Sequence, residues 1–200
     1  MAHLHTEPAP RLHAGHVAFT LLPFALAVAF AVFFALAQAN PDAYRASAFA
    51  WGSTVMAVPA LFALTRRLGR RVLTHWWRLF WTFGLILLLA HGVAMLGWQH
   101  LWRPDLVAAE FGLVGAVLLW GLEAVWLLDV LMAWNRLDWA QAEGRYAWWQ
   151  GCVGAFVLVS FALALLLFGH GPVDPVLGVV LLAGVALALL LRGFDREEAR

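Results

Sequence analysis

The chain alternates long apolar stretches with short polar segments. A helix that crosses a membrane needs about 20 mostly apolar residues. Six stretches meet this requirement, and we predict a transmembrane helix in each: residues 16–39, 46–65, 76–98, 107–134, 147–168 and 175–191. The connections between them are short. The expected fold class is therefore an all-α integral membrane protein with six transmembrane helices in one bundle, and residues 1–200 form a single polytopic membrane domain.

The first stretch has a second interpretation. Residues 35–39 read Ala-Leu-Ala-Gln-Ala, and they end in an A-x-A pattern like that of a signal-peptidase site. However, the apolar segment before it is longer than the 7–15 residues of a secretory signal, and Arg11 alone provides basic charge ahead of it. We favour a retained helix. Cleavage would leave five spans.

Composition excludes other classes of protein. Of the 200 residues, 64% are hydrophobic and 12% are charged, whereas soluble domains have about 45–50% apolar and about 25% charged residues. A soluble globular domain is therefore excluded. The 13 basic residues, all of them Arg, are balanced by 12 acidic ones, so no excess of positive charge indicates nucleic acid as a partner.

The arginines predict the orientation, because short cytoplasmic loops carry most basic residues. Alternating the loops between the two sides leaves only Arg45 and Arg103 on one side. The other side receives eleven: Arg11, Arg66, Arg67, Arg70, Arg71, Arg78, Arg136, Arg145, Arg192, Arg196 and Arg200. Both termini are thus expected in the cytoplasm, and the composition, rich in Ala, Leu, Val, Gly and Arg, is typical of a GC-rich bacterial genome. We predict a multi-pass protein of the bacterial inner (plasma) membrane.

The densest basic cluster is the predicted cytoplasmic loop at residues 66–71. It is interpreted first as a determinant of topology. It also predicts attraction to anionic lipid headgroups, through Arg66, Arg67, Arg70 and Arg71.

The third and fourth spans are joined by a short loop and should be antiparallel neighbours. Aligning Trp98 with Val107 at the outer boundary places Arg78 within about 3 Å of the depth of Asp129. We therefore predict a structural ion pair between Arg78 and Asp129, although such a buried pair is weak evidence for stability.

The same alignment places His91 within about 6 Å of the depth of Glu110. A hydrogen bond between them is expected if their faces agree. A structural histidine is the simpler interpretation, and proton transfer is the alternative, because histidine titrates near neutral pH.

Glu123 is the most informative residue of the sequence. It falls near mid-membrane, level with Thr82 on the third span, and no basic residue shares its depth. Burial without a cation favours the neutral carboxyl. Two interpretations follow: a proton-carrying carboxyl that lines a polar path, or a protonated carboxyl hydrogen-bonded to a neighbouring helix.

The histidines fall in two layers, which suggests b-type haem held by two histidines from different helices. The candidates are His91, His170, His75 and His16. A metal site would have to be assembled from five dispersed side chains: His91, His100, Glu110, His170 and Asp174. They show no ligand spacing on one helix, so we predict no metal site. Cys152 is the only cysteine and excludes an intramolecular disulfide.

The known catalytic motifs are absent, so we favour a non-enzymatic role. The leading hypothesis is a non-catalytic integral subunit, anchor or assembly factor of an inner-membrane complex, surrounded by lipid and partnered by other membrane subunits or by copies of itself. One alternative is a redox subunit that binds b-type haem or quinone. Another is a small proton- or ion-coupled transporter or channel that uses Glu123.

Overall fold

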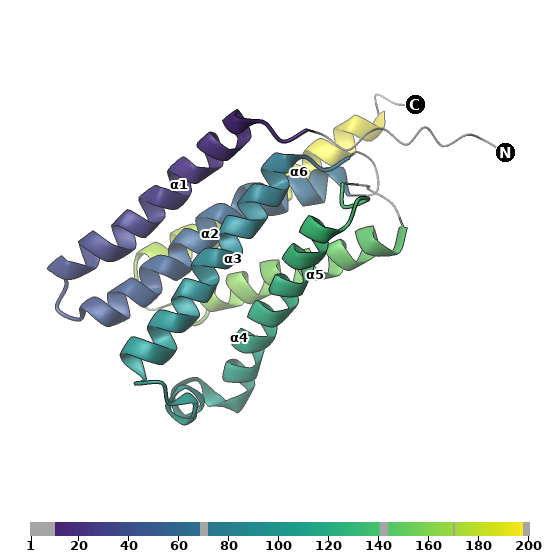
Figure 1. Ribbon diagram of the computed structural model, residues 1–200. Coiled ribbons are helices and arrows are strands. Elements are labelled where there is room, and N and C mark those ends of the chain that lie inside the picture. Colours follow the sequence, from purple (N-terminus) through teal and green to yellow (C-terminus); the bar gives the residue numbers. More distant parts are fainter. Residues whose placement is uncertain (1–10, 69–71, 141–143, 170, 198–200) are drawn as a thin grey trace.

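The structure is a computed structural model, and it describes residues 11–68, 72–140, 144–169 and 171–197. The described residues are helical apart from their connections (Figure 1). The elements are α1 (Ala14–Phe33), η1 (Phe34–Ala37), α2 (Pro41–Arg67), α3 (His75–Val93), η2 (Ala94–Gln99), α4 (Pro104–Asn135), α5 (Gly144–Leu166) and α6 (Val173–Glu197).

Six of the described helical segments are long and apolar enough to cross a membrane. They are Ala14–Ala37, Pro41–Arg67, His75–Gln99, Gly115–Asn135, Gly144–Leu166 and Val173–Phe194. Six helices that are long and apolar enough to cross a membrane are thus confirmed in number, order and approximate position. This supports a multi-pass membrane protein.

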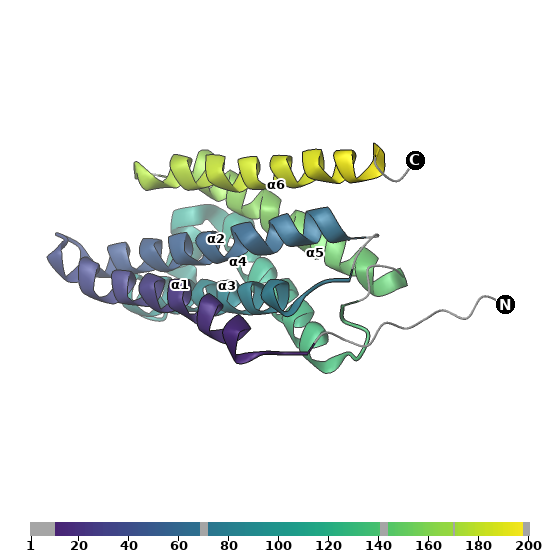
Figure 2. The same ribbon diagram turned by 90° about the horizontal axis from the view of Figure 1, so that it is seen from above.

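Helix α2 is central in the bundle. It packs against α3, α6 and α1, and more lightly against α5, and Figures 1 and 2 show α6 along one side of it and α1 with α3 along the other. Its start is well defined, because Asn40 caps it by accepting a hydrogen bond from the Ala43 N–H at 3.2 Å and Pro41 occupies its first turn. A buried bond from Ser53 Oγ to the Gly84 carbonyl, at 2.7 Å, links α2 to α3.

Helix α4 departs from the predicted span 107–134. Gly112 has φ 73° and ψ 156°, a conformation open essentially to glycine alone, and it breaks the helix. The turns before this break lie across the end of α3 rather than along it (Figure 1). The part of α4 that is long and apolar enough to cross a membrane, here called its membrane-crossing part, is therefore Gly115–Asn135.

This break also shifts the predicted alignment of α3 and α4. Glu123, expected level with Thr82, instead lies against Gly92. Thr82 accepts a hydrogen bond from Trp134, at 2.9 Å. Ten residues of α3 correspond to about 15 Å, so Glu123 lies much nearer the C-terminal end of α3 than its sequence position indicates.

Candidate functional site

The carboxyl of Glu123 occupies a space that Gly92 leaves open on α3. A Cβ atom at Gly92 would collide with Glu123 Oε1, so only glycine allows this approach. Oε1 is buried and has no hydrogen-bond partner among the described residues. The side chain as a whole is half-buried. The prediction that no basic residue shares its depth was made for a level with Thr82. At the level of Gly92, Arg45 of α2 lies near in depth, because Ala46 is hydrogen-bonded to His91, but Arg45 pairs with Asp42.

One turn further along α4, Trp126 packs into a second glycine position of α3. The Trp126 ring lies 3.1 Å from the place where a Cβ of Gly84 would be, and it also contacts Trp81, at 4.5 Å between ring centroids. Gly84 and Gly92 thus let α4 approach α3 closely, as small residues do in membrane bundles.

The predicted ion pair between Arg78 and Asp129 is wrong: these two described residues form no direct salt bridge. Arg78 contacts the His75 Nδ1 atom at 2.8 Å and donates to the Ala133 carbonyl at 3.3 Å. Asp129 Oδ2 instead accepts a hydrogen bond from Trp81 Nε1 at 2.8 Å. The shifted alignment is the reason, because it puts Ala133, one turn beyond Asp129, level with Arg78.

The guanidinium of Arg78 lies between two indole rings. The distances from its Cζ to the ring centroids are 3.9 Å for Trp134 and 4.2 Å for Trp139. Both are within the range of a cation–π interaction. No spacing rule applied to the sequence could show that these two tryptophans meet a cation from another helix.

Asp129 belongs to a buried polar cluster that the sequence did not reveal. Asp129 and Gln150 are fully buried, and the Gln150 amide donates to the Trp139 carbonyl at 3.4 Å. Trp149 lies against Asp129, and Tyr146 lies against Gln150. These contacts join α3, α4, α5 and the segment before α5. Gln150 is the one residue that could have signalled the cluster, as an amide in an apolar helix.

The predicted partner of Glu110 is also corrected. His91 does not bond Glu110: its Nδ1 donates to the Ala46 carbonyl of α2 at 2.9 Å. The partner of Glu110 is His100, whose Nε2 lies 2.7 Å from Glu110 Oε2. Glu110 precedes the break in α4, so it lies outside the membrane-crossing part with a 60% exposed side chain. The His91 interpretation that fits is a structural histidine that holds α3 to α2.

His100 closes the C-terminal end of α3 and η2. Its Nδ1 donates to the Met95 carbonyl at 2.8 Å. Burial alone would lower the pKa of His100, but the hydrogen bonds to Met95 and Glu110 outweigh this effect and raise the pKa above its ordinary value of 6.5. The following residues, Leu101 and Trp102, have φ of 52° and 60°, which is unusual for residues other than glycine.

The haem candidates lie at two ends of the bundle. His16 and His75 are close, at 6.1 Å between ring centroids, and each also contacts a tryptophan. His91 lies 16 residues along α3 from His75, about 24 Å away, so these two cannot ligate one haem. His170 lies outside the described residues. In the part of the chain that the structure describes, no three His, Cys, Asp or Glu side chains are grouped to hold a metal ion.

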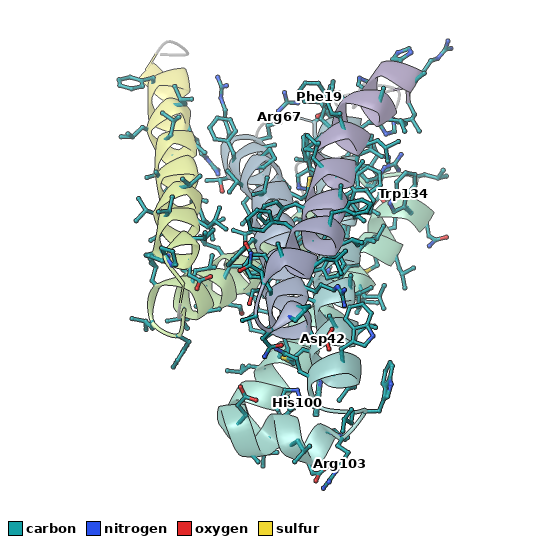
Figure 3. All side chains as sticks on the ribbon, turned by 90° about the vertical axis from the view of Figure 1, so that its left-hand side faces the viewer. Phe19, Asp42, Arg67, His100, Arg103 and Trp134 are labelled. Atoms are coloured by element: carbon teal, nitrogen blue, oxygen red, sulfur yellow. The ribbon has the colours of Figure 1, made fainter. Side chains whose placement is uncertain are left out.

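The two ends of the bundle differ in charge. Figure 3 shows Arg67 toward one end, and Asp42, His100 and Arg103 toward the other. Arg67 donates to the Val72 carbonyl at 3.1 Å, and Arg192 of α6 donates to the Thr65 carbonyl at 2.9 Å. Arg70 and Arg71 of the predicted headgroup cluster lie outside the described residues.

Comparisons of the chain with protein-family models, with curated proteins and with solved structures find no match.

Proposed function

We propose that this protein is a non-catalytic integral subunit, anchor or assembly factor of a larger complex in the bacterial inner membrane. The observation that carries the proposal is the position of Glu123 on α4. A carboxyl at membrane depth is costly in hydrocarbon, and none of the described residues donates a hydrogen bond to it. A neighbouring subunit that covers α4 would provide what this chain does not.

The packing of α4 supports the same proposal. Its main contacts within the chain are with α3 and α5, and its part Gly115–Asn135 exposes large apolar side chains, among them Val117 at 55% and Leu131 at 51%. The arginines at the end of the bundle where Arg67 lies complement anionic headgroups. This attraction would fix the subunit at the cytoplasmic surface.

The proposal is tested by extracting the protein from its native membrane in polymer-bounded lipid discs and measuring particle mass and composition. We expect a second polypeptide in fixed stoichiometry. Particles that hold a single 22.1 kDa chain would contradict the proposal, and particles that hold only copies of this chain would restrict it to a homo-oligomer.

A proton- or ion-coupled transporter is the second candidate, and it is favoured by the occurrence of Glu123 and Asp129 two turns apart on α4. Its test is flux through liposomes that contain the purified protein. Glu123→Gln should reduce flux at least about tenfold if the carboxyl carries the proton, since general acid–base groups contribute about 10²–10⁴-fold in enzymes. Glu110→Gln, outside the span, is the matched control. Equal flux in both variants would remove Glu123 from such a mechanism.

A further inference from the structure

Two neighbouring helices form an outward surface around Glu123, here called the α3–α4 face. Its members are the exposed apolar side chains on either side of the carboxyl: Ile86 and Val93 of α3, and Trp120 and Leu127 of α4. Their exposed fractions are 43%, 50%, 37% and 38%. Glu123 and Gly92 lie between them. The face is therefore an apolar surface with one carboxyl near its centre.

This face differs from the other outward surfaces of the bundle. Helix α1 exposes Phe19, Leu22 and Leu26, and α6 exposes Val176 and Leu187. These side chains are compatible with lipid tails. At the α3–α4 face, by contrast, lipid tails would leave Glu123 without a donor, and an unsatisfied polar group in hydrocarbon costs several kcal/mol.

The structure also limits what can satisfy the carboxyl. Every basic side chain of this sequence other than histidine is an arginine near an end of a predicted span. His91 is next to Gly92 but is turned to the Ala46 carbonyl of α2. Arg45 adjoins Ala46 and so lies near the same level, but it pairs with Asp42 at 2.9 Å and lies over the Trp98 ring. A second copy of the chain would therefore bring a like carboxyl to the depth of Glu123, and an arginine there that already has its partners.

We propose that the α3–α4 face binds a transmembrane helix of a different subunit, and that this helix carries an Arg, Lys or His side chain at the depth of Glu123. The inference rests on the proposed function and names the partner's chemistry. A charge pair formed between two helices in hydrocarbon satisfies both groups at once, and Trp120 adds an aromatic side chain of the type that dominates interface energies.

The test is photo-crosslinking in the native host. p-Benzoyl-phenylalanine replaces Trp120 on the face, or Leu26 of α1 as the control, which is 62% exposed. We expect position 120, and not position 26, to crosslink to a transmembrane segment that contains Arg, Lys or His. Adding Glu123→Leu should reduce the yield at position 120 at least about fivefold, while Glu123→Gln, which keeps hydrogen-bonding capacity, should reduce it less.

Reciprocal substitution completes the test. Replacing the partner's basic residue by Leu should lower the crosslink yield as Glu123→Leu does. The two changes together should restore the yield, because the double variant has no unpaired charge in hydrocarbon. Circular dichroism and gel filtration must show that each variant of this chain folds as the parent does.

The outcomes separate the inference from the proposed function. A stoichiometric partner that crosslinks at position 26, or at neither position, keeps the proposed function and overturns this face as its site. A crosslink from position 120 to a second copy, or to a helix without a basic residue, also overturns the inference. A particle with a single chain and no crosslink overturns both.

Discussion

The guanidinium of Arg78 shows how a single charge is accommodated in this bundle. Although Asp129 is nearby in depth, Arg78 contacts two aromatic rings, a histidine nitrogen and the Ala133 carbonyl instead. This arrangement depends on the shape of the guanidinium. A planar group can stack on two indoles and hydrogen-bond at its edge at the same time.

The first prediction concerns this shape. Arg78→Lys should destabilise the protein by about 1–2 kcal/mol, because an ammonium keeps the charge but cannot stack between Trp134 and Trp139. The measurement is the free energy of unfolding in mixed micelles. Arg103→Lys, at an exposed pair with Asp105, is the control and should change it by about 0.5 kcal/mol or less. Equal effects of the two substitutions would refute the role of stacking.

The second prediction concerns His100, which follows the C-terminal end of α3 and η2. The folded pKa of His100 is raised above 6.5, so the folded state binds its proton more tightly than the unfolded state. The resulting stabilisation is complete below about pH 6.5 and is lost as the pH rises through the folded pKa. Because Glu110 is largely exposed, we expect about 1 kcal/mol or less.

This dependence is measured as the thermal unfolding midpoint between about pH 5.5 and about pH 8.5. Wild type should lose stability toward the alkaline side of that range, and Glu110→Gln should show a shallower loss because the anionic acceptor is gone. The neighbouring charged groups, Arg103 and Asp105, pair with each other and do not titrate in this window. A wild-type curve parallel to that of Glu110→Gln would contradict the prediction.

At the scale of the helix, α4 illustrates how one glycine redirects an element. Gly112 has a positive φ, while Gly121 lies in regular helix, and a Cβ at either position would meet nothing within 4 Å. The two glycines therefore differ in backbone conformation and not in packing. This makes them a matched pair for testing the break.

The third prediction uses that pair. Gly112→Ala should destabilise the protein by about 1–3 kcal/mol, because alanine does not tolerate this backbone region. Gly121→Ala should instead stabilise it by about 0.5–1 kcal/mol, since alanine is the better helix former. Unfolding free energies in mixed micelles measure both changes. A stabilising Gly112→Ala would mean that α4 continues unbroken through residue 112.

The sequence predicted the spans well, because the length of an apolar stretch alone determines whether it can cross a membrane. It could not predict the contacts between helices. Those depend on where a helix begins to run along its neighbour, and the break at Gly112 displaced that point by several residues. For this reason the partners assigned to Arg78 and Glu110 were wrong. Glu123 was identified from its own apolar stretch, without any assigned partner. Side chains that meet across elements, such as Trp139 and Arg78, leave no periodic signal.

At the scale of the whole molecule, the arrangement is a central α2 with peripheral helices that differ in their outward chemistry. Helices α1 and α6 expose large apolar side chains such as Leu22 and Leu187, and the α3–α4 face adds a carboxyl. The carboxyl distinguishes one side of the bundle from the others, whereas the arginines distinguish one end of the bundle from the other. One asymmetry would orient the protein in the membrane, and the other would orient a partner around it.

The fourth prediction tests the orientation along that axis. Cysteine labelling is suited to this chain, because Cys152 is its only thiol and Cys152→Ser gives a background without one. Pro172→Cys, between α5 and α6, and Leu137→Cys, after α4, are exposed positions at the two ends and leave all charges unchanged. Since basic residues are retained on the cytoplasmic side, a membrane-impermeant maleimide should label Pro172→Cys in spheroplasts. It should label Leu137→Cys only after the inner membrane is permeabilised. The reverse pattern would place the arginine-rich end outside and would show that some stronger constraint, such as the insertion of the first helix, determines the topology of this protein.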